Sequence, residues 1–231
     1  MDPDTTLTVH RLDGEGLTLD GFGLARAFFV GDPSSVGEGA YDSLTGRGDP
    51  CRITVDDIRA INTTMRARSK HERWAHLVDR DLDWLAALDS TLDLIAADDR
   101  EWSDAAGEQL VTTAFRETVG PWRGPSVVTK VLHLKRPRLF PVLDDFVAVM
   151  LGVNMPDDAS ADRKVQIAVA LVLHLRQEGR RNLSQLQAVQ QRLAEQGIDR
   201  SLVRIFDAIL WSSHPAIGVP GMTRTLTVAV D

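Results

Sequence analysis

Two adjacent carboxylates, Asp144 and Asp145, lie in the stretch PVLDDFVAVMLG between apolar residues. A carboxylate at this place could cap the helix that the following apolar spacing predicts, because Asp accepts hydrogen bonds from first-turn amides. It could also stabilise positive charge on a bound sugar and orient a water molecule, as carboxylates do in glycoside hydrolysis. The two roles are compatible for Asp144, whereas Asp145 is the more natural acidic residue of a first helical turn.

A group of cations precedes this acidic pair. Its members are Lys130, Lys135, Arg136 and Arg138. Just upstream, Gly124, Pro125 and Ser126 break the chain before an expected helix, so amides at the helix start could bind an anion. In a chain with a net charge of -7, this cluster is the best candidate for phosphate contact. The alternative is the solvated end of a helix, since Lys135 and Arg136 fall in its last turn and suit the helix dipole.

The run GPSVVTKVLHL, a proline-containing loop and then PVLDDFVAVMLGV resemble the helix-hairpin-helix DNA glycosylases. In that superfamily a glycine-rich hairpin leads to a helix, a short loop and an Asp-x-x-Val motif that opens the next helix. Asp144 and Val147 fill this motif. The similarity covers roughly residues 40 to 215, and within the superfamily it is greatest to bacterial proteins with an LHLKRPRLFPVLD-type core.

The resemblance implies a DNA N-glycosylase of base excision repair in which Asp144 is the catalytic carboxylate. The residues that would contact the DNA backbone are Ser126, Lys130, Lys135, Arg136 and Arg138. When Gly124 is placed on the first hairpin glycine, Val128 stands where lyase-type members carry a nucleophilic lysine, which implies a monofunctional enzyme. Cys51 is the only cysteine, which excludes an iron–sulfur cluster and any site with several cysteine ligands. No other metal and no cofactor is expected.

Base excision also requires a pocket or wedge of aromatic or apolar side chains for the flipped nucleotide. The candidates are Trp122, Phe140, Phe146 and Trp211. Each of them is more often a core residue than a ligand contact. His133 and His174 lie on apolar helical faces, where a hydrogen-bonded core histidine is the more common role.

Two other classes of function stay open. One is a catalytically silent module with the same fold that binds nucleic acid or a partner protein, for example in a toxin-antitoxin or defence pair. The other is a helical interaction protein with no role at nucleic acids. The acidic charge favours the silent module, and so does Pro125, which offers no amide at the hairpin.

Composition sets the class of protein. With 231 residues, of which 43% are hydrophobic, the chain can bury one sizeable core. A single cysteine fits a reducing compartment. The acidic first residues and the lack of an apolar run of about 18 residues predict a cytoplasmic protein that is neither exported nor inserted into a membrane.

The expected fold is mainly α, a helix-hairpin-helix glycosylase-like domain. Residues 1–50 hold more than half of the seventeen glycines and predict an irregular arm, followed by a helical domain over 51–231 within a single compact unit. Apolar spacing and caps predict helices at 21–30, 55–66, 69–95 (one bent or two), 103–119, 126–136, 144–151, 160–178, 183–197 and 199–213. The helix at 160–178 is expected to be the most buried, and strands at 7–12 and in TRTLTVAV to pair with each other.

Overall fold

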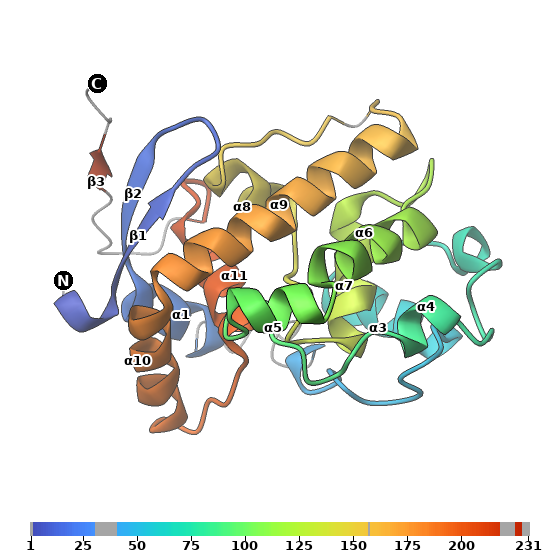
Figure 1. The fold of residues 1–231 in the computed structure, drawn as a ribbon, viewed down its shortest axis with the longest axis horizontal. Coiled ribbons are helices and arrows are strands. Elements are labelled where there is room, and N and C mark those ends of the chain that lie inside the picture. Colours follow the sequence, from blue (N-terminus) through green and yellow to red (C-terminus); the bar gives the residue numbers. More distant parts are fainter. Residues whose placement is uncertain (1, 31–40, 157, 218–224, 228–231) are drawn as a thin grey trace.

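Helices joined by irregular segments surround one hydrophobic core in the computed structural model, which describes residues 2–30, 41–156, 158–217 and 225–227 (Figure 1). The mainly α class is confirmed. The α-helices are α1 Gly21–Val30, α3 Val55–Thr64, α4 Asp83–Ala86, α5 Asp99–Asp104, α6 Gly107–Thr118, α7 Pro125–Lys135, α8 Asp145–Met150, α9 Ala161–Arg181, α10 Leu183–Ala194 and α11 Leu202–Ser213. Two short 3-10 helices are η1 Pro3–Thr5 and η2 His71–Trp74.

The strands form an antiparallel sheet in the order β1-β2-β3, with bounds β1 Thr6–His10, β2 Gly16–Asp20 and β3 Thr225–Thr227. The two predicted terminal strands are present, but their predicted direct pairing is wrong, because β2 lies between them. Sequence alternation over β2 is limited to Leu17 and Leu19, which are both buried. Two apolar residues among glycines are too weak a pattern to predict a strand.

The N-terminal segment packs against helices from the end of the chain. Helix α1 contacts α10 and α11. The Asn182 amide pairs with strand β1 as a neighbouring strand would: its Oδ1 accepts from the Thr8 amide (2.9 Å) and its Nδ2 donates to the Thr8 carbonyl (2.8 Å). Leu7 and Leu24 are buried in the same core as the later helices. The predicted arm therefore contributes β1, β2 and α1 to one packed unit.

Residues 66–98 differ most from the expectation. The predicted long helix or helix pair is wrong, because η2 and α4 are the only helical turns there. Side chains from distant helices bind the carbonyls that a helix would use. Arg136 donates to the Leu85 (2.7 Å) and Leu88 (2.9 Å) carbonyls, and Arg176 donates to the Leu94 carbonyl (2.8 Å). These long-range hydrogen bonds satisfy the backbone without an α-helix, while the apolar side chains remain buried.

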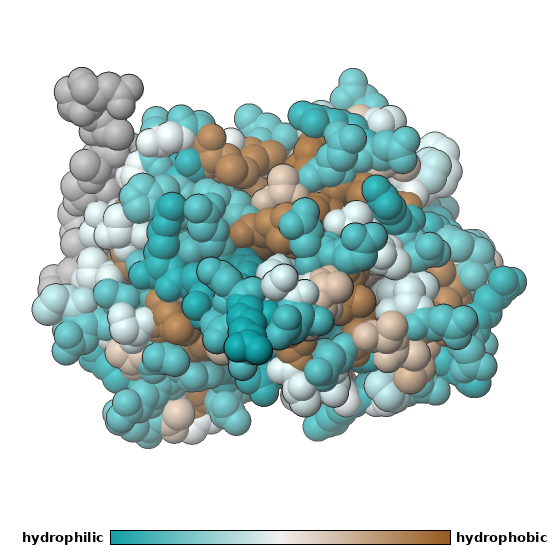
Figure 2. Space-filling model, in the orientation of Figure 1, coloured by the Kyte–Doolittle hydropathy of each residue, from teal (hydrophilic) through white to brown (hydrophobic). Residues whose placement is uncertain are grey.

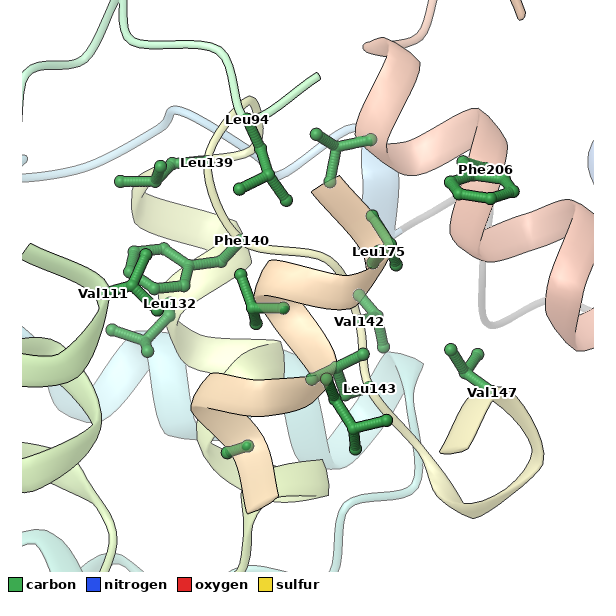
Figure 3. Close-up of a cluster of buried hydrophobic side chains, with 14 of the residues drawn as sticks. Leu94, Val111, Leu132, Leu139, Phe140, Val142, Leu143, Val147, Leu175 and Phe206 are labelled. Carbon is green, nitrogen blue, oxygen red and sulfur yellow. The ribbon is translucent and has the colours of Figure 1, made fainter. Parts of the chain in front are cut away.

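Burial is greatest in α11, not in α9 as predicted. All residues of α11 except Trp211 are buried, whereas α9 buries fewer than half of its 21 residues. Helix α9 runs along the molecule with one side on α6 (Figure 1), while α11 contacts α1, α8 and α10. Figure 3 shows side chains of the core from α7, α8, α9 and α11, among them Leu132, Val147, Leu175 and Phe206.

The face in Figure 2 is mostly hydrophilic, with apolar groups between polar ones, as is usual for a protein surface. Among the residues that the structure describes, no helix has both the length and the apolar character needed to cross a bilayer.

Candidate functional site

The loop between α7 and α8 places Asp144, and buried side chains hold this loop on both sides. The contacts are His133 Nδ1 with the Phe140 carbonyl (2.6 Å), Thr129 Oγ1 with the Leu143 amide (3.1 Å), and Asp207 Oδ2 with the Val142 amide (2.8 Å). Two helices distant in sequence, α7 and α11, supply these groups. The end of the loop, and with it Asp144, is therefore fixed relative to the core.

Asp144 is the N-cap of α8, as predicted. Its Oδ1 accepts a hydrogen bond from the Val147 amide (3.0 Å). Burial raises the pKa of Asp144 above its ordinary value, although the Val147 amide, the charge of Lys130 and a hydrogen bond from Trp211 act in the opposite direction. The carboxylate is thus a partly desolvated group with a cation and an aromatic side chain beside it.

A cavity of about 20 Å³ adjoins Asp144. Its polar lining residues besides Asp144 are Arg204 and Asp207 of α11. Phe28 of α1, Met65 after α3 and Trp211 also line the cavity, and these three are half-buried. The site is therefore built from α1, α8, α11 and the end of α3, which are far apart in the chain.

Aromatic side chains gather beside this cavity. The ring of Trp211 lies 5.4 Å from that of Phe28 and 6.0 Å from that of Phe146, between centroids. Phe146 also stacks on His214 at 4.3 Å. Two of the predicted aromatic candidates, Trp211 and Phe146, thus lie near Asp144, and two further rings join them that the sequence pattern did not single out.

The predicted cation cluster is divided by the fold. Lys130 is buried in α7 and lies close enough to influence the Asp144 carboxylate. Lys135 is buried too, with Nζ 2.7 Å from Asp57 Oδ2 and 3.1 Å from the Asp49 carbonyl. Arg136 is buried against main-chain carbonyls. Lys135 and Arg136 therefore brace the interior at the end of α7, with little surface left for a phosphate.

Arg138 lies apart from Asp144. It is exposed and pairs with Asp93 at 3.2 Å, at the edge of a polar pocket of about 540 Å³ that Arg200 and His133 also line. The prediction that His133 is a core residue is confirmed, since it is fully buried. Burial, together with the nearby Arg204, lowers its pKa to about 4. The ring is therefore neutral near pH 7.

A tight turn joins α6 to α7 and borders a second pocket. Gly120 and Arg123 exchange two backbone hydrogen bonds of 3.1 Å each. The pocket beside the turn has a volume of about 310 Å³, and its lining includes Arg73, Trp122 and Ser126. The side chains of Asp145 and Lys164 also line it. The N-terminal end of α7 thus faces a pocket that contains two basic side chains.

Trp122 and Phe140 have opposite surroundings. Trp122 is 73% exposed at the tip of the turn, with the Arg73 guanidinium 5.8 Å from its ring centroid. Phe140 is fully buried and makes an edge contact with Phe115 at 6.0 Å. The structure therefore brings Trp122 together with Ser126, and Trp211 together with Asp144, while Phe140 lies in the core.

A buried ion-pair network behind Asp144 was not anticipated. Arg204 Nε donates to Asp42 (2.7 Å) and its Nη1 donates to Asp207 (2.7 Å), and all three residues are buried. The sequence holds one signal for it. Arg204 and Asp207 are opposite charges three residues apart in an otherwise apolar helix, and buried charges are usually paired.

Comparisons with known proteins give one match. The model of a family described as a family of unknown function (DUF6308) matches residues 22–214. Neither the curated proteins nor the solved structures include a match to this chain. Within the described residues, no three His, Cys, Asp or Glu side chains come together as a metal site would require.

Proposed function

Because the chain belongs to DUF6308, a family of unknown function, we propose its function from the geometry of the site: a monofunctional DNA N-glycosylase with Asp144 as the catalytic carboxylate. One observation carries the proposal. Asp144 is fixed at a helix start beside a small cavity and a group of aromatic rings, and burial raises its pKa. The tight turn between two helices, upstream of Asp144, supports the same proposal.

The chemistry needs a carboxylate near the sugar. Cleavage of an N-glycosidic bond builds positive charge on the anomeric carbon and the ring oxygen, and a nearby carboxylate stabilises that charge. A partly desolvated carboxylate acts more strongly than a solvated one, since less water screens it. Asp144 is such a partly desolvated carboxylate, and its hydrogen bond with the Val147 amide fixes its orientation.

The aromatic group beside Asp144 suits a base that has left the helical stack. A flipped base is held by stacking against aromatic side chains, and each stacked base contributes about 1–3 kcal/mol. Trp211 and Phe146 are half-buried, so each keeps part of its surface available. In this proposal they form one wall of the base pocket, with Phe28 in edge contact with Trp211.

The pocket at the α6–α7 turn is the proposed contact with the DNA backbone. Ser126, at the N-terminal end of α7 where the helix dipole is positive, lines this pocket. Arg73 and Lys164 add positive charge, against the negative charge of Asp145. Trp122, exposed at the tip of the turn, is the proposed wedge for the gap left by the flipped base. Because Asp144 and Asp145 are adjacent, this pocket and the cavity flank the same end of α8.

A second candidate is a binding module without catalysis. The observation in its favour is that Lys135 and Arg136 bind internal partners, in a chain whose net charge is -7. Fewer cations are then left to attract phosphates, and binding to DNA would be weak or would depend on a partner protein.

The two candidates are separated by a panel of duplexes that carry uracil, an alkylated base or an oxidised base, with release detected by alkaline cleavage at the abasic site. The glycosylase proposal expects release from at least one duplex, and a slower rate for Trp211→Ala. Borohydride should trap no covalent complex, as expected for a monofunctional enzyme. Salt-sensitive binding without release from any duplex would support the binding module, and the absence of both would contradict both candidates.

A further inference from the structure

The cavity beside Asp144 has the size and the polar lining of a site for one water molecule. Its volume of about 20 Å³ compares with the roughly 10–15 Å³ that a single buried water needs. Buried waters typically bind about three polar groups. Asp144, Arg204 and Asp207 all line this cavity, so acceptors and a donor are present together.

Arg204 supplies the second observation. Arg204 is 3% exposed, and its Nη2 is buried without a hydrogen-bond partner in the described part of the chain. Its Nε and Nη1 are already used by Asp42 and Asp207. An unpaired N–H of a buried guanidinium costs free energy, so a hydrogen-bond partner is expected. Arg204 lines both the small cavity and the pocket of about 540 Å³, and a water in the small cavity would also meet Asp144 and Asp207.

We propose that this cavity binds one water molecule between Arg204, Asp144 and Asp207, and that this water is the nucleophile of the base-excision reaction, with Asp207 as its proton acceptor. The proposal rests on the glycosylase function. In the reaction, the water oxygen bonds to the sugar C1′ while the C1′–N bond breaks. The base leaves with the bonding electrons and takes a proton from solvent. The proton released by the water moves to Asp207 and then to solvent.

The surroundings of Asp207 suit a proton acceptor, and those of Asp144 suit a group that stabilises charge on the sugar. Asp207 Oδ2 accepts from the Val142 amide and Oδ1 accepts from Arg204, and each oxygen has a further lone pair. Burial raises the pKa of Asp207 to about 7, against the effect of Arg204. A group that titrates near neutral pH accepts and releases a proton efficiently. Asp144 lies nearer the surface and stabilises the charge on the sugar.

Two variants of α8 test the site without changing a polar group. Val147→Ile adds one methylene to a buried side chain that lines the cavity, and this group would displace the water. Val149→Ile adds the same methylene to a half-buried residue of α8 that does not line the cavity. The readouts are electron density in the cavity of a high-resolution crystal structure and single-turnover base release, with thermal unfolding as a check on folding.

The expected result is an ordered water in the wild-type protein, no water in Val147→Ile, and base release slowed about 100-fold in that variant, a typical loss when a reacting group is misplaced. Val149→Ile should keep the water and the rate. An empty wild-type cavity, or a wild-type rate in a folded Val147→Ile protein that lacks the water, would overturn the proposal while leaving the glycosylase function in place. No base release by the wild type would overturn both the function and the role of the water, and density in the cavity would then show a purely structural water.

Discussion

Arg136→Met should destabilise the protein strongly, because Arg136 braces the irregular segment between η2 and α5. The guanidinium donates to the carbonyl oxygens of Leu88 (2.9 Å), Leu85 (2.7 Å) and Pro50 (3.0 Å). Methionine fills a similar volume but donates no hydrogen bond. The substitution would remove the side-chain donor of three carbonyls in distant segments, although the Leu85 carbonyl keeps the Leu88 amide as a donor (3.3 Å).

The magnitude follows from those three bonds. Each buried acceptor left without its donor costs about 1–3 kcal/mol. Neighbouring Ala86 and Ala87 are exposed, so part of the segment can relax and reach water. We therefore expect a loss of about 3–5 kcal/mol in the free energy of unfolding, the lower part of the range for three such acceptors.

Urea unfolding followed by circular dichroism measures this loss, with Arg138→Met as the matched control. Arg138 is exposed and pairs with the buried Asp93 carboxylate, which keeps its hydrogen bonds from the Ile95 and Ala96 amides when Arg138 is removed. Loss of this half-exposed pair should therefore cost about 1 kcal/mol. The structural role of Arg136 would be refuted if Arg136→Met folds, has a free energy of unfolding within about 1 kcal/mol of the wild type and binds DNA more weakly. Arg136 would then be a phosphate contact, as the sequence predicts.

Three further outcomes are expected. Asn182→Ala should lower stability by about 1–3 kcal/mol and speed amide hydrogen exchange in β1, because Asn182 holds both backbone groups of Thr8; unchanged exchange would contradict this. The pKa of Asp207 is raised from 3.8 to about 7, so its stabilising contribution is fully present below about pH 4 and is lost as pH rises through about 7. The unfolding free energy of the wild type should therefore fall relative to that of Asp207→Asn over this range, and a constant or opposite difference would contradict the raised pKa. Trp122→Ala should change stability by less than about 0.5 kcal/mol, since the ring is 73% exposed, but should weaken DNA binding; equal affinity would remove Trp122 from the proposed interface.

Features encoded by neighbouring residues could be predicted from the sequence. Thr54 and Asp57 form the capping box of α3, Gly124 precedes α7, and Asp144 caps α8. Each signal lies within one helical turn of the boundary that it sets. Gly152, with φ +83, ends the segment after α8 for the same local reason.

Features that depend on partners distant in the sequence could not be predicted. The apolar residues of the segment before α5 have helical spacing. Its carbonyls, however, accept hydrogen bonds from Arg136, at the C-terminal end of α7, and from Arg176 of α9. Lys135 resembles a surface cation in the sequence, and only the fold brings it to Asp57. The cavity beside Asp144 is lined by Phe28 together with residues of α11. A pattern of neighbouring residues in the sequence does not predict that such distant residues lie side by side.

The central claim is that Asp144 performs base excision, and the Asp144→Asn variant tests it most directly. Asparagine caps helices about as well as aspartate, so the fold should persist, and thermal unfolding checks this. On the duplex that the wild type processes, single-turnover base release should fall at least about 100-fold, the scale expected for losing one electrostatic stabiliser of a transition state, while DNA affinity changes little. Release by a folded Asp144→Asn protein at the wild-type rate would contradict the claim.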